Sequence, residues 1–191
     1  MNYEKKIEKL FDDSINTISK SKKLKKEISE SANIISKCLE KNGKIIAFGN
    51  GGSAADSQHF VAEFIGRFQK ERKSMPAISF TTDTSIITAI GNDYGFEKIF
   101  ERQSESLVRK NDVVVAISTS GKSKNVVNGV KIAKRKGAKI ICLTGNTSKI
   151  LSNLSDVEIA IPSKSTPRIQ EVHRLILHFI CEIVEDNFSK N

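Results

Sequence analysis

Long hydrophobic runs and clustered cysteines are both missing from this chain of 191 residues. No window holds the roughly 18 consecutive apolar residues that a membrane-spanning helix requires. The charged segment 1–10 lacks the apolar stretch of a signal peptide. The three cysteines lie far apart in apolar surroundings, so we expect neither a disulfide framework nor a cysteine metal site. These absences predict a cytoplasmic protein with no membrane association.

The net charge of +9 raises the question whether the protein binds nucleic acid. Tryptophan, one of the side chains on which bases stack, is absent. The densest basic run, 20–26, carries five lysines and no arginine or aromatic residue. Base stacking and bidentate base contacts need those missing residue types. We therefore interpret the run as a solvated helix end and expect no nucleic-acid partner, although a basic surface would help to attract an anionic substrate.

The order of apolar segments predicts an α/β fold in a single domain. Between Tyr3 and Glu40 apolar residues recur at steps of three and four, which predicts two amphipathic helices broken around 20–23. Short apolar segments then alternate with helical ones, which predicts a parallel sheet with helices on both faces. The expected strands are 44–48, 77–80, 112–117, 139–143 and 157–161. The expected later helices are 53–68, 83–90, 96–109, 123–136 and 167–187. The terminal helices carry more apolar surface than a small sheet covers, so we expect them to pack against each other and against other subunits.

Two expected strands run into loops of small residues that open helices, 48–53 (FGNGGS) and 117–123 (ISTSGKS). Ligands of open parallel sheets bind at the carboxyl ends of strands, and a helix N-terminus offers free N–H groups that suit a phosphate. Four hydroxyl residues within six positions of the second loop favour phosphate binding over a plain tight turn with a serine cap. Neither loop has the complete nucleotide P-loop pattern, so we expect a phosphorylated metabolite rather than ATP or NAD.

The three histidines lie in two of the expected helices. His59 and Glu63 are four residues apart and share one helix face. His173 and His178 lie among apolar residues of the last helix, close to Gln170. Such side chains are compatible with surface hydrogen bonds, core contacts, an acid–base pair or metal ligands, and periodicity alone does not choose between these.

Four segments together resemble the phosphoheptose isomerases, or sedoheptulose 7-phosphate isomerases, of the sugar isomerase (SIS) domain superfamily. They are FGNGGSAADSQHFVAEF (48–64), AIGNDYGF (89–96), AISTSGKSKNV (116–126) and RIQEVHRLILH (168–178). The resemblance runs over nearly the whole chain and implies a single SIS domain, 1–191, with 1–42 as an N-terminal helical extension used in oligomer packing. It implies a flavodoxin-like αβα sandwich around a five-stranded parallel sheet, and a homotetramer with active sites between subunits.

The resemblance also implies an activity. The reaction is the aldose–ketose isomerisation of D-sedoheptulose 7-phosphate to D-glycero-D-manno-heptose 7-phosphate, through an enediol. It is the first step toward nucleotide-activated heptose for lipopolysaccharide or capsule. Two alternatives remain: a non-catalytic SIS-domain binding protein of the DnaA-initiator-associating type, and an isomerase for another sugar phosphate. The first alternative lacks a carboxylate at the position of Glu63 and an imidazole at that of His178, and this chain has both.

Matched positions give the implied site. The phosphate would bind Ser118, Thr119, Ser120 and Ser123, with Ser53 nearby. The sugar would be lined by Asn50, Gly51, Gly52, Asn92 and Asp93. One zinc ion per subunit would be held by His59, Glu63, Gln170 and His178. Whether this ion is catalytic, structural or adventitious is left open. Glu63 and His178 would be the acid–base pair, and we expect Glu63 to take the first proton.

Spacing sharpens one point about the last helix. Gln170 and His178 are eight residues apart, a rise of about 12 Å along a helix. His173 is nearer to Gln170, but we follow the family match for His178 and expect a structural or supporting role for His173. The same span suggests that parts of the site come from different chains. Some relatives carry an acidic residue where this chain has Pro167, so a role for that position is not carried over.

Overall fold

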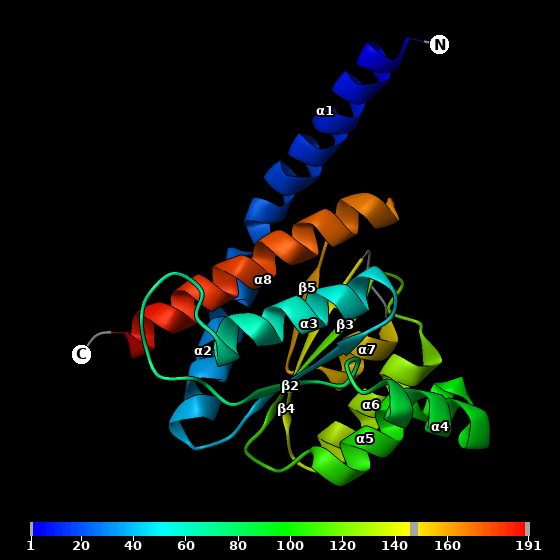
Figure 1. Ribbon diagram of the computed structural model, residues 1–191. Helices are drawn as coiled ribbons and strands as arrows, with labels where there is room; N and C mark the ends of the chain where they lie inside the picture. The colour runs from blue at the N-terminus through cyan, green and yellow to red at the C-terminus, as the bar shows by residue number, and fades with distance from the viewer. Residues whose placement is uncertain (1, 146–148, 190–191) are drawn as a thin grey trace.

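A five-stranded, all-parallel sheet forms the centre of the protein in the computed structural model, which describes residues 2–145 and 149–189 (Figure 1). The order of the strands across the sheet is β2-β1-β3-β4-β5. Their bounds are β1 Ile45–Gly49, β2 Ala77–Ser79, β3 Val113–Ser118, β4 Lys139–Thr144 and β5 Val157–Ala160. β1 and β3 are buried along their whole length, as expected for strands that are covered on both faces. The predicted sheet is thus confirmed.

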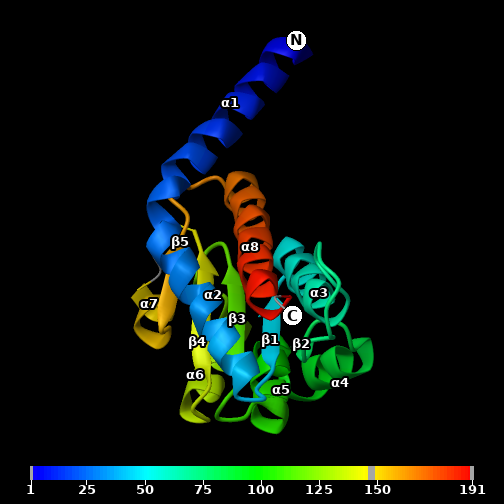
Figure 2. The same ribbon diagram turned by 90° about the vertical axis from the view of Figure 1, so that its left-hand side faces the viewer.

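Helices cover both faces of the sheet and complete an αβα sandwich (Figures 1 and 2). One hydrophobic cluster joins one face to α2 (Lys25–Glu40), α3 (Gly52–Ile65) and α8 (Thr166–Phe188). A second cluster joins the other face to α4, α5, α6 and α7. Their bounds are α4 Thr84–Tyr94, α5 Ile99–Leu107, α6 Lys124–Arg135 and α7 Lys149–Leu154. Both faces of β1, β3 and β4 therefore contribute to packing, since alternate residues of these strands belong to different clusters.

The first helix, α1 (Tyr3–Ser21), projects away from the sandwich (Figures 1 and 2). The predicted break between the N-terminal helices is confirmed by a short 3-10 helix, η1 (Lys22–Leu24). Large apolar side chains on α1 are exposed, among them Phe11 and Ile15 at 65% and 62%. Such exposure marks an interaction surface, although the use of 1–42 in oligomer packing stays a prediction.

The predicted helices and strands differ from the observed ones mainly at their ends. The expected helix 83–90 continues through Gly91 to Tyr94, and Gly95 ends it with a φ of 91° that favours glycine. The expected helix 96–109 divides into η2 (Phe96–Lys98) and α5. Helix α7 was not predicted, because a helix of six residues carries too little periodicity to recognise.

The cysteines and the helices also test two expectations about composition. Cys38, Cys142 and Cys181 are buried free thiols, as predicted. Burial raises the pKa of Cys38 to about 11, so its thiol stays protonated at neutral pH. Within 2–145 and 149–189, none of the helices combines the length and apolar character needed to cross a bilayer.

Candidate active site

The predicted phosphate loop lies between β3 and α6, at the carboxyl edge of the sheet. The strand order reverses between β1 and β3, and this crevice is where open α/β sheets bind ligands. The hydroxyl of Ser118 lies 3.3 Å from that of Ser123 and accepts the N–H of Gly121 at 3.2 Å. Gly121 has a φ of 62°, so the turn itself requires glycine. The loop therefore places hydroxyls beside the N-terminus of α6.

The other loop, after β1, is tied to the first turn of α6 by a reciprocal amide pair. Asn50 Nδ2 donates to Asn125 Oδ1 at 2.9 Å, and Asn125 Nδ2 donates to Asn50 Oδ1 at 2.8 Å. Asn125 is buried, at 3% exposure. Sequence reasoning missed Asn125, although a polar residue on the buried face of an amphipathic helix was a usable signal. The pair fixes the spacing between the two loops that are predicted to hold the ligand.

Helices α3 and α8 run side by side in the same direction (Figure 1). They also present polar residues to each other. Gly52 faces Gln170: a Cβ at Gly52 would lie only 2.6 Å from Gln170 Nε2. Four residues along each helix, Asp56 pairs with Arg174 at 2.5 Å. The third contact lies beyond that pair and joins His59 and Glu63 of α3 to His178 of α8. We call these three successive contacts the polar ladder.

The last rung of the polar ladder joins His59, Glu63 and His178. His59 Nε2 lies 3.1 Å from Glu63 Oε1 and 3.1 Å from His178 Nε2. One nitrogen, oxygen or other ligand atom from each residue lies within 4.8 Å of the others. Two imidazoles and a carboxylate are a common donor set for zinc, so the chemistry of this cluster fits the predicted ion.

The electrostatics of this cluster favour a neutral imidazole at His178. Burial lowers the pKa of His178 from its ordinary value, and the neighbouring His59 lowers it further, against the opposing effect of Glu63. The ring of Phe68 lies 5.6 Å from that of His178 and covers one side of it. A neutral imidazole can accept a proton or bind a metal ion.

His173 has a different place on the same helix. It is fully buried, and its Nε2 lies 3.0 Å from the carbonyl oxygen of Thr144, to which it donates. Burial lowers its pKa to about 4, so the ring is neutral. The structure thus brings His178, and not His173, to His59 and Glu63, and His173 has the structural position that was expected.

Three further predicted residues, Gln170, Asn92 and Asp93, lie either in the ladder or on a separate helix. Gln170 lies beside Gly52, at the opposite end of the ladder from His178. Asn92 and Asp93 lie on the last turn of α4, where Asn92 Nδ2 donates to Asp93 Oδ1 at 2.8 Å. Among 2–145 and 149–189, no hydrogen bond joins that pair to either loop or to the ladder. Pro167 stands in the first turn of α8, where its missing N–H costs no helix bond.

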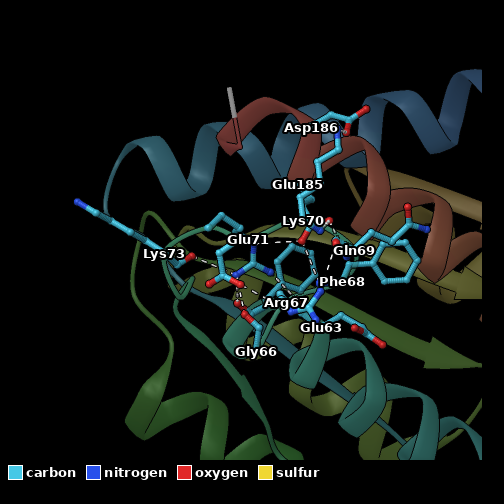
Figure 3. A network of polar contacts seen from close by, with 12 residues as sticks. Glu63, Gly66, Arg67, Phe68, Gln69, Lys70, Glu71, Lys73, Glu185 and Asp186 are labelled. Atoms are coloured by element: carbon cyan, nitrogen blue, oxygen red, sulfur yellow. Dashed lines mark hydrogen bonds and ion pairs between the residues drawn. The ribbon is translucent and has the colours of Figure 1, made fainter. Parts of the chain in front are cut away.

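A buried ion pair fixes the end of α3 next to Glu63, and sequence reasoning missed both partners. Arg72 donates to the carbonyl oxygens of Glu63 and Phe64 at 2.5 and 2.8 Å, which caps the helix. Glu185 of α8 lies 3.5 Å from Arg72 Nε and accepts three backbone N–H groups of 68–70 (Figure 3). A glutamate inside the apolar face of α8 was the available signal. The pair holds Glu63 in place relative to α8.

Comparisons with known proteins agree with this geometry. The family model described as "SIS domain" matches residues 9–145. The phosphoheptose isomerase of Aliarcobacter butzleri is 50% identical over 151 residues, which are 79% of this chain and 80% of that protein. The solved phosphoheptose isomerase GmhA from Neisseria gonorrhoeae superposes with a TM-score of 0.91 at 41% identity, over 97% of this chain and 100% of that one. A phosphoheptose isomerase from Francisella tularensis gives 0.93 at 36% identity, with the same coverage.

Proposed function

This chain belongs to the phosphoheptose isomerase family of SIS-domain proteins, and from that premise we propose that it converts D-sedoheptulose 7-phosphate to D-glycero-D-manno-heptose 7-phosphate. The product would enter nucleotide-activated heptose for lipopolysaccharide or capsule. One observation of the structure carries the proposal: Glu63 meets His178 and His59 at one end of the polar ladder, and the other end begins at Gly52, in the loop 48–53. His59 lies seven residues into the helix after Gly52, a rise of about 10 Å. A seven-carbon sugar phosphate has a comparable length.

The proposed chemistry needs a proton removed beside a carbonyl and returned at the neighbouring carbon. Glu63 takes the first proton, since its carboxylate is partly shielded, with 18% side-chain exposure, yet open to a ligand. His178, neutral at working pH, moves a proton between the substrate oxygens by accepting it from one and giving it to the other, or, after accepting a proton, returns it at the neighbouring carbon. The loop 118–123 holds the phosphate through its hydroxyls and the N-terminus of α6. The sugar is thereby fixed at one end, and the reacting carbons lie at the cluster.

One zinc ion per subunit is part of the proposal. His59, Glu63 and His178 would hold it, and when bound it would polarise the substrate oxygens as a Lewis acid. Gln170 lies two turns away, beside Gly52, so Gln170 of a second subunit becomes the candidate fourth ligand. Metal analysis of purified protein should give about one zinc per chain, and His59→Ala should abolish it. Full occupancy in His59→Ala would contradict this ligand set, and activity without zinc would make the ion structural or adventitious.

The proposal includes a homotetramer with active sites between subunits. It is supported by the apolar side chains that α1 and α8 leave exposed, such as Phe11, Phe179 and Ile183. Light scattering coupled to size exclusion should give four times the mass of the 21.2 kDa chain. A fully active monomer would contradict it. The cytoplasmic location stays a prediction, which cell fractionation tests.

The direct test is incubation with D-sedoheptulose 7-phosphate, followed by NMR or mass-coupled detection of the aldose. Arabinose 5-phosphate and other ketose or aldose phosphates serve as competing substrates for the alternative of another sugar phosphate. No conversion of any of them in the presence of zinc, together with tight binding of an initiator protein, would favour the non-catalytic alternative. The contact between Glu63 and the histidines argues against that outcome, since a binding protein has no need of a proton-transfer pair.

A further inference from the structure

Arg174 forms the middle rung of the polar ladder and belongs to none of the residues assigned above. It lies four residues after Gln170 and four before His178, so the three side chains share one face of α8. The shared face looks toward α3, where Asp56 is the partner of Arg174. Arg174 therefore stands between the ligand-loop end of the ladder and the proposed reaction centre.

Asp56 orients the guanidinium of Arg174. Arg174 Nε and Nη2 both donate to Asp56 Oδ1, at 2.9 and 2.5 Å. The Asp56 side chain is only 4% exposed, whereas that of Arg174 is 47% exposed. A guanidinium carries five N–H donors in a planar fork. Two of them are directed at Asp56, and the fork leaves others free to face a ligand.

A cavity of ≈ 620 Å³ adjoins this guanidinium. Its lining includes Gly52, Asp56, Gln170, Arg174 and His178, which represent all three rungs of the ladder. The cavity therefore extends along the ladder from Gly52, in the loop 48–53, to His178. A plain helix–helix ion pair would need no such cavity, and it would not need the half-exposed arginine to reach it.

We propose that Arg174 is a substrate-contacting residue, which donates hydrogen bonds to the sugar oxygens next to the reacting carbons. This inference rests on the proposed function and deepens it. Proton removal by Glu63 leaves negative charge on the enediolate oxygens, and a fixed cation beside them stabilises that charge more than it stabilises the neutral ketose. Asp56 is the positioning residue, since it holds the guanidinium toward the cavity.

Three variants at Arg174 and Asp56 test the contact, and a fourth variant, which removes an arginine elsewhere on the surface, is the control. Arg174→Met keeps the apolar stem, Arg174→Lys keeps the charge without the fork, and Asp56→Asn weakens the orientation. Arg135→Met, at an exposed position in the last turn of α6, is the control for loss of a surface arginine. We expect kcat/KM for sedoheptulose 7-phosphate to fall about 10- to 100-fold in Arg174→Met, in line with the loss of a hydrogen bond to a charged group. Arg174→Lys should recover part of the loss, Asp56→Asn should show a smaller loss, and the control should stay within twofold.

Inhibition by inorganic phosphate distinguishes the loss of a contact with the sugar from a general disturbance of the folded protein. The inhibition constant of phosphate reports the loop 118–123 alone, so it should not change in Arg174→Met, and thermal unfolding should stay near that of the wild type. A wild-type kcat/KM in Arg174→Met would overturn the inference, as would an equal loss of phosphate binding.

Calorimetric binding of sedoheptulose 7-phosphate keeps this test distinct from that of the proposed function. A wild-type protein that binds the sugar phosphate without converting it would contradict the proposed function alone. In that case a dissociation constant unchanged by Arg174→Met would overturn the contact, and a weakened one would support it. A wild-type protein that neither binds nor converts the sugar phosphate overturns both.

Discussion

The loop 118–123 and the polar ladder are two regions of one candidate site, and they are built in opposite ways. The loop is contiguous in sequence and is held by short contacts, such as that between Ser118 and Gly121. The ladder joins residues of α3 to residues of α8 that are separated in sequence by 118 positions (Asp56 and Arg174) or 119 positions (His59 and His178). It therefore exists only when α8 packs along α3. Loop geometry follows from one strand-to-helix junction, whereas ladder geometry depends on the whole sandwich. The two regions should therefore respond separately to substitution, with the loop governing substrate affinity and the ladder governing turnover.

The largest separation is expected for Glu63→Gln. Loss of the proposed base should lower kcat about 10³-fold, within the usual range for general acid–base catalysis. The amide keeps the size of the side chain, so inhibition by inorganic phosphate at the loop should stay unchanged. Steady-state kinetics with phosphate as inhibitor measures both quantities. Near-normal turnover in Glu63→Gln would remove Glu63 from the chemistry.

The second prediction concerns the pH dependence of stability that arises from the buried His173. The folded-state pKa of His173, about 4, lies below the unfolded value of about 6.5, so the unfolded chain binds more protons between these values. The stability that depends on a neutral His173 is present above pH 6.5 and is lost as pH falls toward 4, by about 3 kcal/mol in total.

Urea unfolding at pH 7 and pH 5 measures this dependence. Wild-type protein should lose about 2 kcal/mol between the two values because of His173. His173→Gln should lack that component, although it should be less stable at pH 7, where the bond to Thr144 is weakened. Equal pH dependence in both proteins would show that the ring is not buried in its neutral form.

A third prediction concerns the loop. Thr119→Val keeps the shape of a half-buried side chain and removes one hydroxyl beside the proposed phosphate. The Michaelis constant should rise about tenfold, the effect of one hydrogen bond to a charged group, and kcat should change little. Ser155→Ala, a hydroxyl removed from a distant turn, is the control. A fall in kcat with an unchanged Michaelis constant would show that loop and ladder are not separable.

The smallest effect is expected where the two loops are tied together. Asn125→Ala removes the amide pair with Asn50 and should lower kcat/KM about fivefold, the range of one or two neutral hydrogen bonds. Because Asn50 is also predicted to line the sugar, Asn50→Ala should cost more than Asn125→Ala, and the double substitution should cost little more than Asn50→Ala alone. Equal losses in the two single variants would mean that Asn50 acts only through the pair.

The sequence predicted the regular parts of the fold because periodicity and strand-to-helix junctions are local properties. The five strands and the break near Lys22 follow from such patterns. The short helix α7 was not predicted because it has too few residues to show a helical period of apolar positions. The capping of α3 by Arg72 was not predicted because it depends on a side chain that lies eight residues after Phe64.

The candidate site was predictable to a similar extent. Motif resemblance selected His178 over His173, and in the structure His178 lies beside His59, whereas its role in the site stays a prediction. Arg174 and Asn125 escaped notice because their partners, Asp56 and Asn50, lie far away in the sequence. The buried polar position of Asn125 was a signal that it has a partner, but the sequence does not say which distant residue that partner is.

The most direct measurement is ¹H NMR of sedoheptulose 7-phosphate in D₂O, with zinc-loaded wild-type protein and with Glu63→Gln. An enediol route run by the ladder predicts that wild-type protein forms the aldose phosphate with deuterium at a reacting carbon. It also predicts that Glu63→Gln, which still binds inorganic phosphate, forms neither the aldose nor the deuterated sugar on the same timescale. Absence of aldose with the wild-type protein, or equal conversion by Glu63→Gln, would contradict the assignment of the chemistry to the ladder.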